Sequence, residues 1–271
     1  MSAPTSLKST AHPQLPIDRC AVLMSISLVA EPVCPATPHV SRSLQVGGFT
    51  AFSATDFPGR LAAVVFVQGC PWACGYCHNP HLQPRLNHSP VNWTDVTARL
   101  RRRVGLLDAV VFSGGEPTMD PTLADAMREV RQMGFSVGLH TAGMYPRRLA
   151  EVLPLVDWVG LDIKSLAPDY DHITATPGSA DAVWRSLRAL LDSGVAFECR
   201  TTVHPELHCE IDILALAEQL RAMGVRNYAL QAFRAAAGAV ATFPARSKPL
   251  LNANHFSELS ANFDNFVYRS T

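Results

Sequence analysis

The sequence lacks an excess of charge of either sign, a long apolar run and an internal repeat. Its 271 residues carry 23 Lys and Arg against 23 Asp and Glu, and this balance gives no general attraction for nucleic acid or for an anionic membrane surface. The longest apolar run near the N-terminus, residues 21–30, contains serines and is too short to span a bilayer. It also lacks the basic start and the cleavage site of a secretory signal. We therefore expect a cytoplasmic protein that binds neither nucleic acid nor membrane.

Cysteines are few and unevenly placed. Seven is an odd number, and three of them, Cys70, Cys74 and Cys77, crowd into eight positions, which favours metal ligation over a disulfide framework. The others are expected to take no part in ligation: Cys20, Cys34, Cys199 and Cys209.

The first 43 residues differ from the rest, because prolines and serines are scattered through them with no helical or strand period. We interpret residues 1–43 as a flexible N-terminal extension, or as the product of a start codon assigned too early, with Met24 as an alternative start. Residues 44–271 are expected to form one domain with a short C-terminal tail, since a chain of this length can bury one sizeable core.

From residue 44 onward, strand-like and helix-like segments alternate. Strands are expected over Ala62–Val67, Ala109–Ser113, Ser136–His140, Trp158–Ile163, Ala196–Val203 and Asn227–Phe233. Helical patterns include Thr94–Arg103, Pro121–Met133, Ala180–Asp192 and Ile211–Met223. Such βα units imply a parallel sheet covered by helices, and six of them fall short of the eight in a closed barrel. The predicted fold class is α/β, a partial, open-sided (βα)6 barrel with parallel strands and outer helices.

Polar side chains recur on one face of these strands near their carboxyl ends. They are His140, Asp162, Lys164, Glu198, Arg200 and Gln231. Residues two apart in a strand share a face, and buried charge is costly in a covered sheet unless it is paired or binds a ligand. Solvated strand ends are the alternative. We favour a polar, ligand-binding lumen.

The strongest motif is Cys70-Pro-Trp-Ala-Cys74-Gly-Tyr-Cys77, which directly follows an expected strand. A cubane iron–sulfur cluster normally takes four thiolates, so three on one loop leave one iron open, and an open position is where a metal centre performs chemistry. A zinc site with His78 or His81 as the fourth ligand is the alternative. Zinc motifs, however, usually show paired CxxC units.

A second motif, Gly114-Gly115-Glu116-Pro-Thr, follows the strand expected at 109–113. The glycines let the backbone turn sharply and approach a ligand closely, and Glu116 offers an acceptor for an ammonium group. A plain βα turn would explain Gly-Gly-Glu alone, but it explains less well why the motif accompanies CxxxCxxC.

Together the two motifs resemble those of the radical S-adenosylmethionine superfamily, which implies a partial barrel of the radical SAM type. Within it, the chain resembles glycyl-radical-enzyme activating proteins, above all those of anaerobic ribonucleoside-triphosphate reductase. The resemblance covers about residues 44–235. It is carried by Gly47–Gly59, Cys77-His-Asn-Pro80, Phe112–Thr118, Asp162-Ile-Lys164 and Arg200-Thr-Thr-Val203.

The resemblance implies a [4Fe–4S] cluster held by Cys70, Cys74 and Cys77, with S-adenosylmethionine on the open iron. It places Lys164 with these cysteines in the catalytic set. Cofactor-binding residues implied in the same way are Tyr76, Cys77, His78, Gly114, Gly115, Glu116, Asp162, Ile163, Lys164, Arg200 and Gln231. Among them, Gly115 and Glu116 would receive the methionyl amine, and Arg200 would clamp a carboxylate.

The implied reaction is reductive cleavage of S-adenosylmethionine to a 5′-deoxyadenosyl radical, which takes hydrogen from a glycine of a partner enzyme. The expected partner is anaerobic ribonucleotide reductase, and the expected electron donor is a flavodoxin- or ferredoxin-type protein. Two alternatives stay open. One is a radical enzyme for a small molecule, similar to the deazaguanine synthases, whose cluster motif typically has a longer spacing. The other is a non-catalytic metal-binding module.

One motif departs from the family pattern, and two histidines have no expected role as ligands. Where the family often has Thr-Asn-Gly, this chain has Thr141-Ala142-Gly143, which leaves one polar contact fewer. His204 and His208, near the end of the fifth expected strand, are interpreted as surface or loop histidines.

Overall fold

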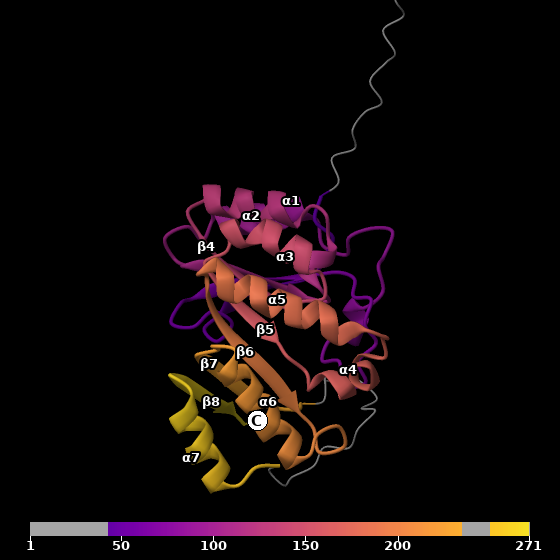
Figure 1. Ribbon diagram of the computed structural model, residues 1–271. Helices are drawn as coiled ribbons and strands as arrows, with labels where there is room; N and C mark the ends of the chain where they lie inside the picture. The colour runs from indigo at the N-terminus through magenta and orange to yellow at the C-terminus, as the bar shows by residue number, and fades with distance from the viewer. Residues whose placement is uncertain (1–42, 235–249, 271) are drawn as a thin grey trace, which may run out of the picture. The chain divides into compact units, whose positions relative to one another are not determined.

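A computed structural model describes residues 43–234 and 250–270. These residues form an eight-stranded sheet in which the strands follow one another in chain order (Figure 1). The strands are β1 (Val46–Ser53), β2 (Ala62–Val67), β3 (Ala109–Gly114), β4 (Ser136–Thr141), β5 (Trp158–Asp162), β6 (Ala196–Val203), β7 (Asn227–Ala232) and β8 (Asn265–Arg269). β1 runs antiparallel to β2, and all other neighbours are parallel. β1 and β8 stand at opposite ends of this order, so the sheet is open.

Helices lie in the connections between the parallel strands, on the outside of the sheet (Figure 1). They are α1 (Trp93–Arg101), α2 (Leu123–Gln132), α3 (Pro146–Val152), α4 (Ala167–Thr174), α5 (Ser179–Ser193), α6 (Glu210–Ala222) and α7 (Ala253–Asn262), with the 3-10 helices η1 (Pro80–Leu82), η2 (Pro117–Met119) and η3 (Leu153–Leu155). α3 packs against α5, and α6 packs against α7.

The two faces of the sheet bury different side chains. The outer face joins the apolar sides of the helices in one large buried cluster, to which Phe112, Leu139 and Cys199 belong. The inner face holds a smaller cluster built around Phe57 and Trp158, whose ring centroids are 5.5 Å apart. This small cluster forms the floor of a lumen, because the inner-face residues become polar toward the carboxyl ends of the strands.

The predicted open α/β sheet with outer helices is confirmed, and all six expected strands are present within two residues of their expected bounds. The sheet has two strands more than the six expected. The two additional strands are β1 and β8. They were not predicted because β1 contains two glycines and no regular alternation, and because β8 is only five residues long. α7 and β8 occupy the segment that was expected to be a short tail, and they extend the parallel sheet by one further unit.

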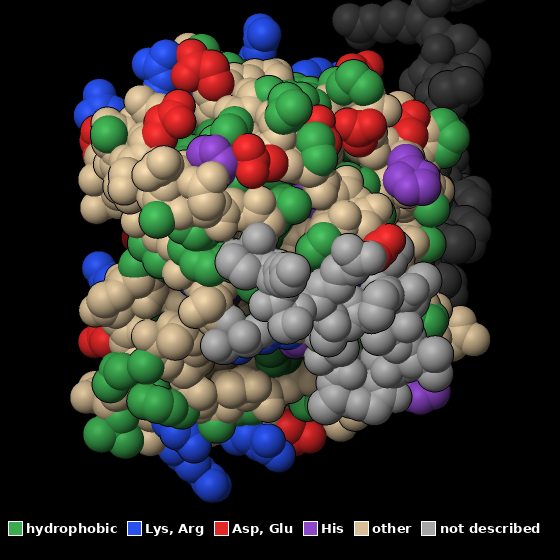
Figure 2. All heavy atoms as spheres, turned by 90° about the horizontal axis from the view of Figure 1, so that it is seen from below, with side chains coloured by type: hydrophobic (Ala, Val, Ile, Leu, Met, Phe, Trp, Pro, Cys, Tyr) green, Lys and Arg blue, Asp and Glu red, His purple; other side chains and the backbone are tan. Residues whose placement is uncertain are grey.

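The proposed extension lies outside the described residues, apart from position 43. Cys20 and Cys34 also lie outside them. Within the described part of the chain, no helix combines the length and the apolar character needed to cross a bilayer. Figure 2 shows acidic and basic side chains on the same face, as expected from the balanced composition.

Candidate active site

The three clustered cysteines lie on a loop that starts where β2 ends. Backbone hydrogen bonds fix this loop from within: Gly69 N donates to Leu82 O at 2.7 Å, and Cys70 N donates to Gln83 O at 2.9 Å. The side-chain amide of Gln68, which is 2% exposed, donates to the carbonyls of His81 and Pro84. The loop therefore leaves and returns at one place, and its middle projects over the carboxyl end of the sheet.

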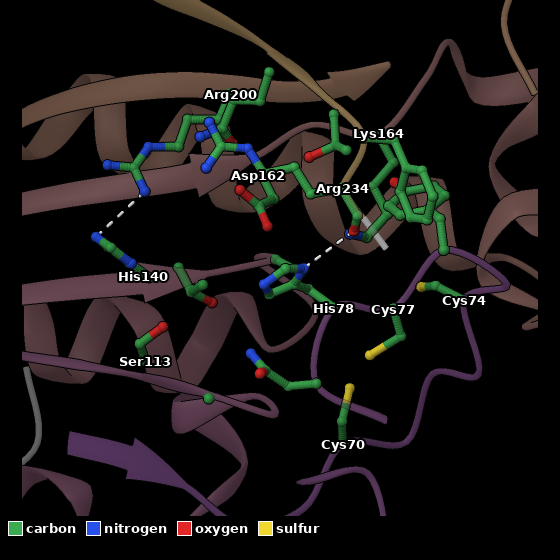
Figure 3. A pocket seen from close by; sticks show the side chains of 18 of the residues that line it. Cys70, Cys74, Cys77, His78, Ser113, His140, Asp162, Lys164, Arg200 and Arg234 are labelled. Carbon is green, nitrogen blue, oxygen red and sulfur yellow. Dashed lines mark hydrogen bonds between the residues drawn. The ribbon is translucent and has the colours of Figure 1, made fainter. Parts of the chain in front are cut away.

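Cys70, Cys74 and Cys77 all line one cavity of about 920 Å3, and Figure 3 shows them together at one end of it. All three are half-buried. Burial raises the pKa of the Cys70 thiol to about 12 and also raises the pKa of Cys74. Alone, the Cys70 and Cys74 thiols keep their protons, and the positive charge of a bound metal centre would favour their thiolate forms.

The donor set of this loop, three cysteine thiols, is of the kind that holds an iron–sulfur cluster. In the described segments 43–234 and 250–270, no three His, Cys, Asp or Glu side chains are placed to hold one metal ion. Around a single zinc ion, ligands crowd at about 2.0–2.3 Å. In a cubane each thiolate binds its own iron, so the three sulfurs stand farther apart.

Gly114 and Gly115 bring the end of β3 against the start of the cysteine loop. Gly115 N donates to Val67 O at 2.9 Å, and Glu116 N donates to Gly69 O at 2.8 Å. Gly114 has φ +117°, and a Cβ on Gly115 would lie 2.2 Å from Gly69 O. The two motifs are therefore in direct backbone contact, and both glycines line the cavity.

The Glu116 carboxylate points away from the cavity and is fully buried. It accepts hydrogen bonds from the backbone N–H and hydroxyl of Thr118, from the Thr141 hydroxyl and, at 2.9 Å, from Ala142 N. Burial raises the pKa of this carboxyl group, and these hydrogen bonds oppose the shift. In this structure the side chain ties the end of β3 to the end of β4, and the backbone of Gly114 and Gly115 is the part of the motif that borders the cavity.

Lys164 projects between β5 and the cysteine loop. Its Nζ lies 5.3 Å from the ring centroid of Tyr76 and 5.9 Å from that of Trp72, so both aromatic residues of the cysteine motif stabilise the ammonium. Burial by itself would lower the pKa of Lys164, but the neighbouring Tyr76, Cys74 and Asp162 raise it overall. The ammonium is therefore charged at neutral pH.

The other end of the cavity holds an ion-paired cluster. Arg200 Nε donates to Glu198 at 2.9 Å, and the Arg200 guanidinium lies over the Trp158 ring at 4.9 Å. Figure 3 shows the guanidinium reaching toward His140, at 3.3 Å from Nε2. Burial lowers the pKa of His140, so this ring is neutral. Its Nε2 lies 2.8 Å from the Asp56 carbonyl oxygen, which can only accept, so Nε2–H donates there and is not an acceptor for Arg200. Arg269 adds two hydrogen bonds to Glu198.

The remaining candidates are distributed along the same cavity. His78, Asp162, Ile163 and Gln231 line it, and His78 Nδ1 lies 3.2 Å from the Arg234 carbonyl oxygen (Figure 3). All predicted site residues therefore border one cavity except the Glu116 side chain. Arg269 was missed, because no strand was predicted for residues 265–269.

His204 and His208 were interpreted as surface or loop histidines, which is correct for the loop and wrong for the surface. They lie in the loop after β6, but they are 1% and 4% exposed. The loop turns back on itself, since the backbone N–H groups of Leu207 and His208 both donate to His204 O. Cys199 is fully buried on the outer face of the sheet.

Comparison with protein-family models gives a match to the Radical SAM superfamily over residues 64–225. A Methanocaldococcus jannaschii protein named "Putative glycyl-radical enzyme activating enzyme" is 29% identical over 197 residues, which are 69% of this chain and 79% of that protein. The pyruvate formate-lyase-activating enzyme of Streptococcus mutans is 28% identical over 66% of this chain and 72% of its own length. The 7-carboxy-7-deazaguanine synthase of Thermococcus kodakarensis is 31% identical, but over only 42% of this chain and 45% of its own length.

Solved structures with the same fold include SuiB of Streptococcus suis bound to the precursor peptide SuiA. It has a TM-score of 0.62 and 14% identity, covering 76% of this chain and 48% of the SuiB chain. QueE of Escherichia coli has a TM-score of 0.52 and 19% identity, covering 84% of this chain and 94% of its own. At these identities the likeness concerns the fold alone.

Proposed function

Because the chain belongs to the radical SAM superfamily, we propose that it is a glycyl-radical-enzyme activase. The observation that carries the proposal is the joining of three thiols, the Gly114-Gly115 backbone and the Lys164 ammonium in one cavity beside an open sheet edge. Relatives named as activating enzymes that align over about two thirds of the chain support the same reading.

The cofactors of the superfamily are a [4Fe–4S] cluster and S-adenosylmethionine. Cys70, Cys74 and Cys77 would hold the cluster through their thiolates. When bound, the two cofactors supply a 5′-deoxyadenosyl radical that can abstract hydrogen from carbon. The cavity of about 920 Å3 is near the upper end of the ~300–1,000 Å3 usual for ligand sites.

The protein's own residues would bind and orient the two cofactors. The half-buried thiols and the Gly115 backbone form the cofactor end of the cavity. Lys164 carries a positive charge that suits a carboxylate, and Asp162 beside it offers acceptors to an amine or to ribose hydroxyls. Arg200 is already paired with Glu198, so it would clamp a ligand carboxylate only through the part of its guanidinium that is turned to the cavity.

For the partner we propose the anaerobic ribonucleoside-triphosphate reductase. Support comes from the run Gly47–Gly59, one of the segments in which the sequence resembles the activating proteins of that reductase. This run forms β1 and the loop after it, where Phe57 packs on Trp158 and the Asp56 carbonyl contacts His140 at the lumen. A small-molecule reaction similar to that of the deazaguanine synthases is the second candidate, favoured by one relative that aligns over less than half of the chain.

For the electron donor we propose a flavodoxin- or ferredoxin-type protein in the cytoplasm. No Asp or Glu occurs between Asp56 and Asp95, a segment that contains the whole cysteine loop. An acidic donor protein approaching this loop would therefore meet no like charge from that segment.

The experiment is anaerobic reconstitution with iron and sulfide, reduction with dithionite and assay for 5′-deoxyadenosine after S-adenosylmethionine is added. The wild type should form a cubane and release 5′-deoxyadenosine, and Cys74→Ala should do neither at a measurable level. Cys209→Ala is the matched control, because this cysteine is exposed and outside the cavity. Tight zinc binding without a cubane or 5′-deoxyadenosine would refute the proposal.

A further inference from the structure

The main chain of Lys164 leaves the sheet at the point where its side chain enters the cavity. The last ladder contact between β5 and β6 is Ile163 N to Arg200 O, at 2.8 Å. Beyond it, the part-buried amide and carbonyl of Lys164 have no strand partner, and backbone groups shielded from water need one.

Two buried side chains supply these partners. Lys164 N donates to the hydroxyl of Tyr170, a fully buried residue of α4, at 2.9 Å. His208 Nε2 lies 2.8 Å from Lys164 O. The residue is thus held on both sides of its Cα, from α4 and from the loop that precedes α6.

The hydrogen bonds around His208 fix its tautomer. A carbonyl oxygen can only accept, so Nε2 must carry the proton that is donated to Lys164 O. Nδ1 is then an acceptor, and His204 N donates to it at 3.2 Å. Nδ1 also lies 3.3 Å from His204 O, a longer contact than the 2.8 Å from Nε2 to Lys164 O, and a neutral ring places its one proton at the shorter contact. Burial lowers the pKa of His208, which agrees with a neutral ring.

We propose that His208 is a positioning residue: its Nε2–H holds the Lys164 carbonyl and, together with Tyr170, places the Lys164 ammonium for binding the carboxylate of S-adenosylmethionine. The inference rests on the proposed cofactor site. It gives a function to a histidine that does not line the cavity. The Lys164 ammonium, lying over the Tyr76 and Trp72 rings, is the group whose placement depends on it.

The test is the dissociation constant of S-adenosylmethionine on reconstituted enzyme, measured by equilibrium dialysis without turnover. Lys164→Met should raise Kd by about 10-fold or more, as expected for a lost charged contact. His208→Leu should raise it about 3- to 10-fold with unchanged iron content, and His208→Gln, which can donate from its amide, should stay within about 2-fold.

A double variant separates positioning from general damage. In a Lys164→Met background, His208→Leu should cause no further rise in Kd, because the group that it positions is gone. A rise of the same size in both backgrounds would overturn the proposal. If His208→Leu does not fold, Tyr170→Phe replaces it, since it removes one oxygen and keeps the packed ring.

The tautomer gives a readout independent of the cofactors. Nitrogen NMR of the apo protein labelled at histidine should show His208 with a protonated Nε2 and a bare Nδ1, and the reverse would contradict the proposal. An unchanged Kd in Lys164→Met would refute the cofactor contact itself. The expected Kd pattern without glycyl radical formation would refute the proposed activase function and leave the positioning role intact.

Discussion

The guanidinium of Arg269 donates two hydrogen bonds to the carboxylate of Glu198, at 2.9 and 3.0 Å. This pair joins β8 to the inner face of β6, although β7 lies between them. Arg200 donates to the same carboxylate, so one acidic group balances two guanidinium groups at the polar end of the cavity. The last strand thus contributes to the cavity as well as to the sheet edge.

Glu198→Gln should lower the free energy of unfolding by about 2–3 kcal/mol, since removing one member of a buried charge cluster leaves the others uncompensated. This loss is at the low end of the ~3–5 kcal/mol usual for breaking a buried ion pair, because the Arg269 side chain is about one-third exposed. Urea denaturation of the apo protein measures it. Glu218→Gln is the control, because its pair with Arg221 is exposed, and it should have no measurable effect.

The ion pairs of Glu198 with Arg269 and Arg200 also predict how the free energy of unfolding depends on pH. Burial would raise the pKa of Glu198, but Arg269 and Arg200 hold it below its ordinary value of 4.5. A carboxyl group with a lowered pKa in the folded state stabilises the protein above its unfolded pKa, and this contribution is lost as pH falls through the folded value. The stability gap between wild type and Glu198→Gln should therefore be constant from pH 7 to about 5.5 and shrink below about 4.5. A gap that widens on acidification would contradict the assigned pairing.

The sequence was sufficient to predict the six central strands, because their apolar residues are bounded by turns. It did not predict β8, where a five-residue strand with Asn and Arg at its ends has no distinctive pattern. Long-range pairing of this kind appears only when the chain is folded, which is why Arg269 was missed. In contrast, the places of the cysteines, the glycines and Lys164 at the ends of predicted strands, together with the family resemblance, were enough to predict that they lie at one cavity.

Gly115→Ala should abolish cluster assembly and destabilise the apo protein, because the new Cβ would lie 2.2 Å from the backbone oxygen of Gly69. The backbone of Gly69 cannot move aside as a flexible side chain can. The contact between the start of the cysteine loop and the loop that follows β3 must therefore break. Iron content after reconstitution and the thermal midpoint measure the effect. Gly48→Ala, where the Cβ would meet Phe66 at an ordinary 3.6 Å, should retain both.

Thr141→Val should destabilise the protein by about 1–3 kcal/mol, the usual cost of leaving a buried acceptor without its donor. The Thr141 hydroxyl donates to the buried Glu116 carboxylate at 2.6 Å and accepts from Gly143 N at 3.0 Å. Thr141→Ser keeps the hydroxyl and should lose less than half as much in chemical denaturation. Equal losses in the two variants would show that the methyl packing, and not the hydrogen bond, matters.

Glu116 illustrates where interpretation of the sequence reached its limit. A glutamate after two glycines at a ligand-binding loop was expected to receive an amine. In the structure its carboxylate accepts hydrogen bonds from its own loop and from the end of β4, and its contact with an amine stays a prediction. Whether such a side chain faces a ligand or the protein depends on the neighbouring strand, which a local motif does not specify.

The measurement that tests the central claim most directly is electron paramagnetic resonance of the anaerobic ribonucleoside-triphosphate reductase after incubation with this protein, S-adenosylmethionine and a reductant. The account predicts a stable glycyl radical signal on the reductase with the wild type, the same signal with Cys209→Ala and none with Cys74→Ala. Release of 5′-deoxyadenosine without any glycyl radical on the reductase would contradict the assigned partner and favour a small-molecule substrate.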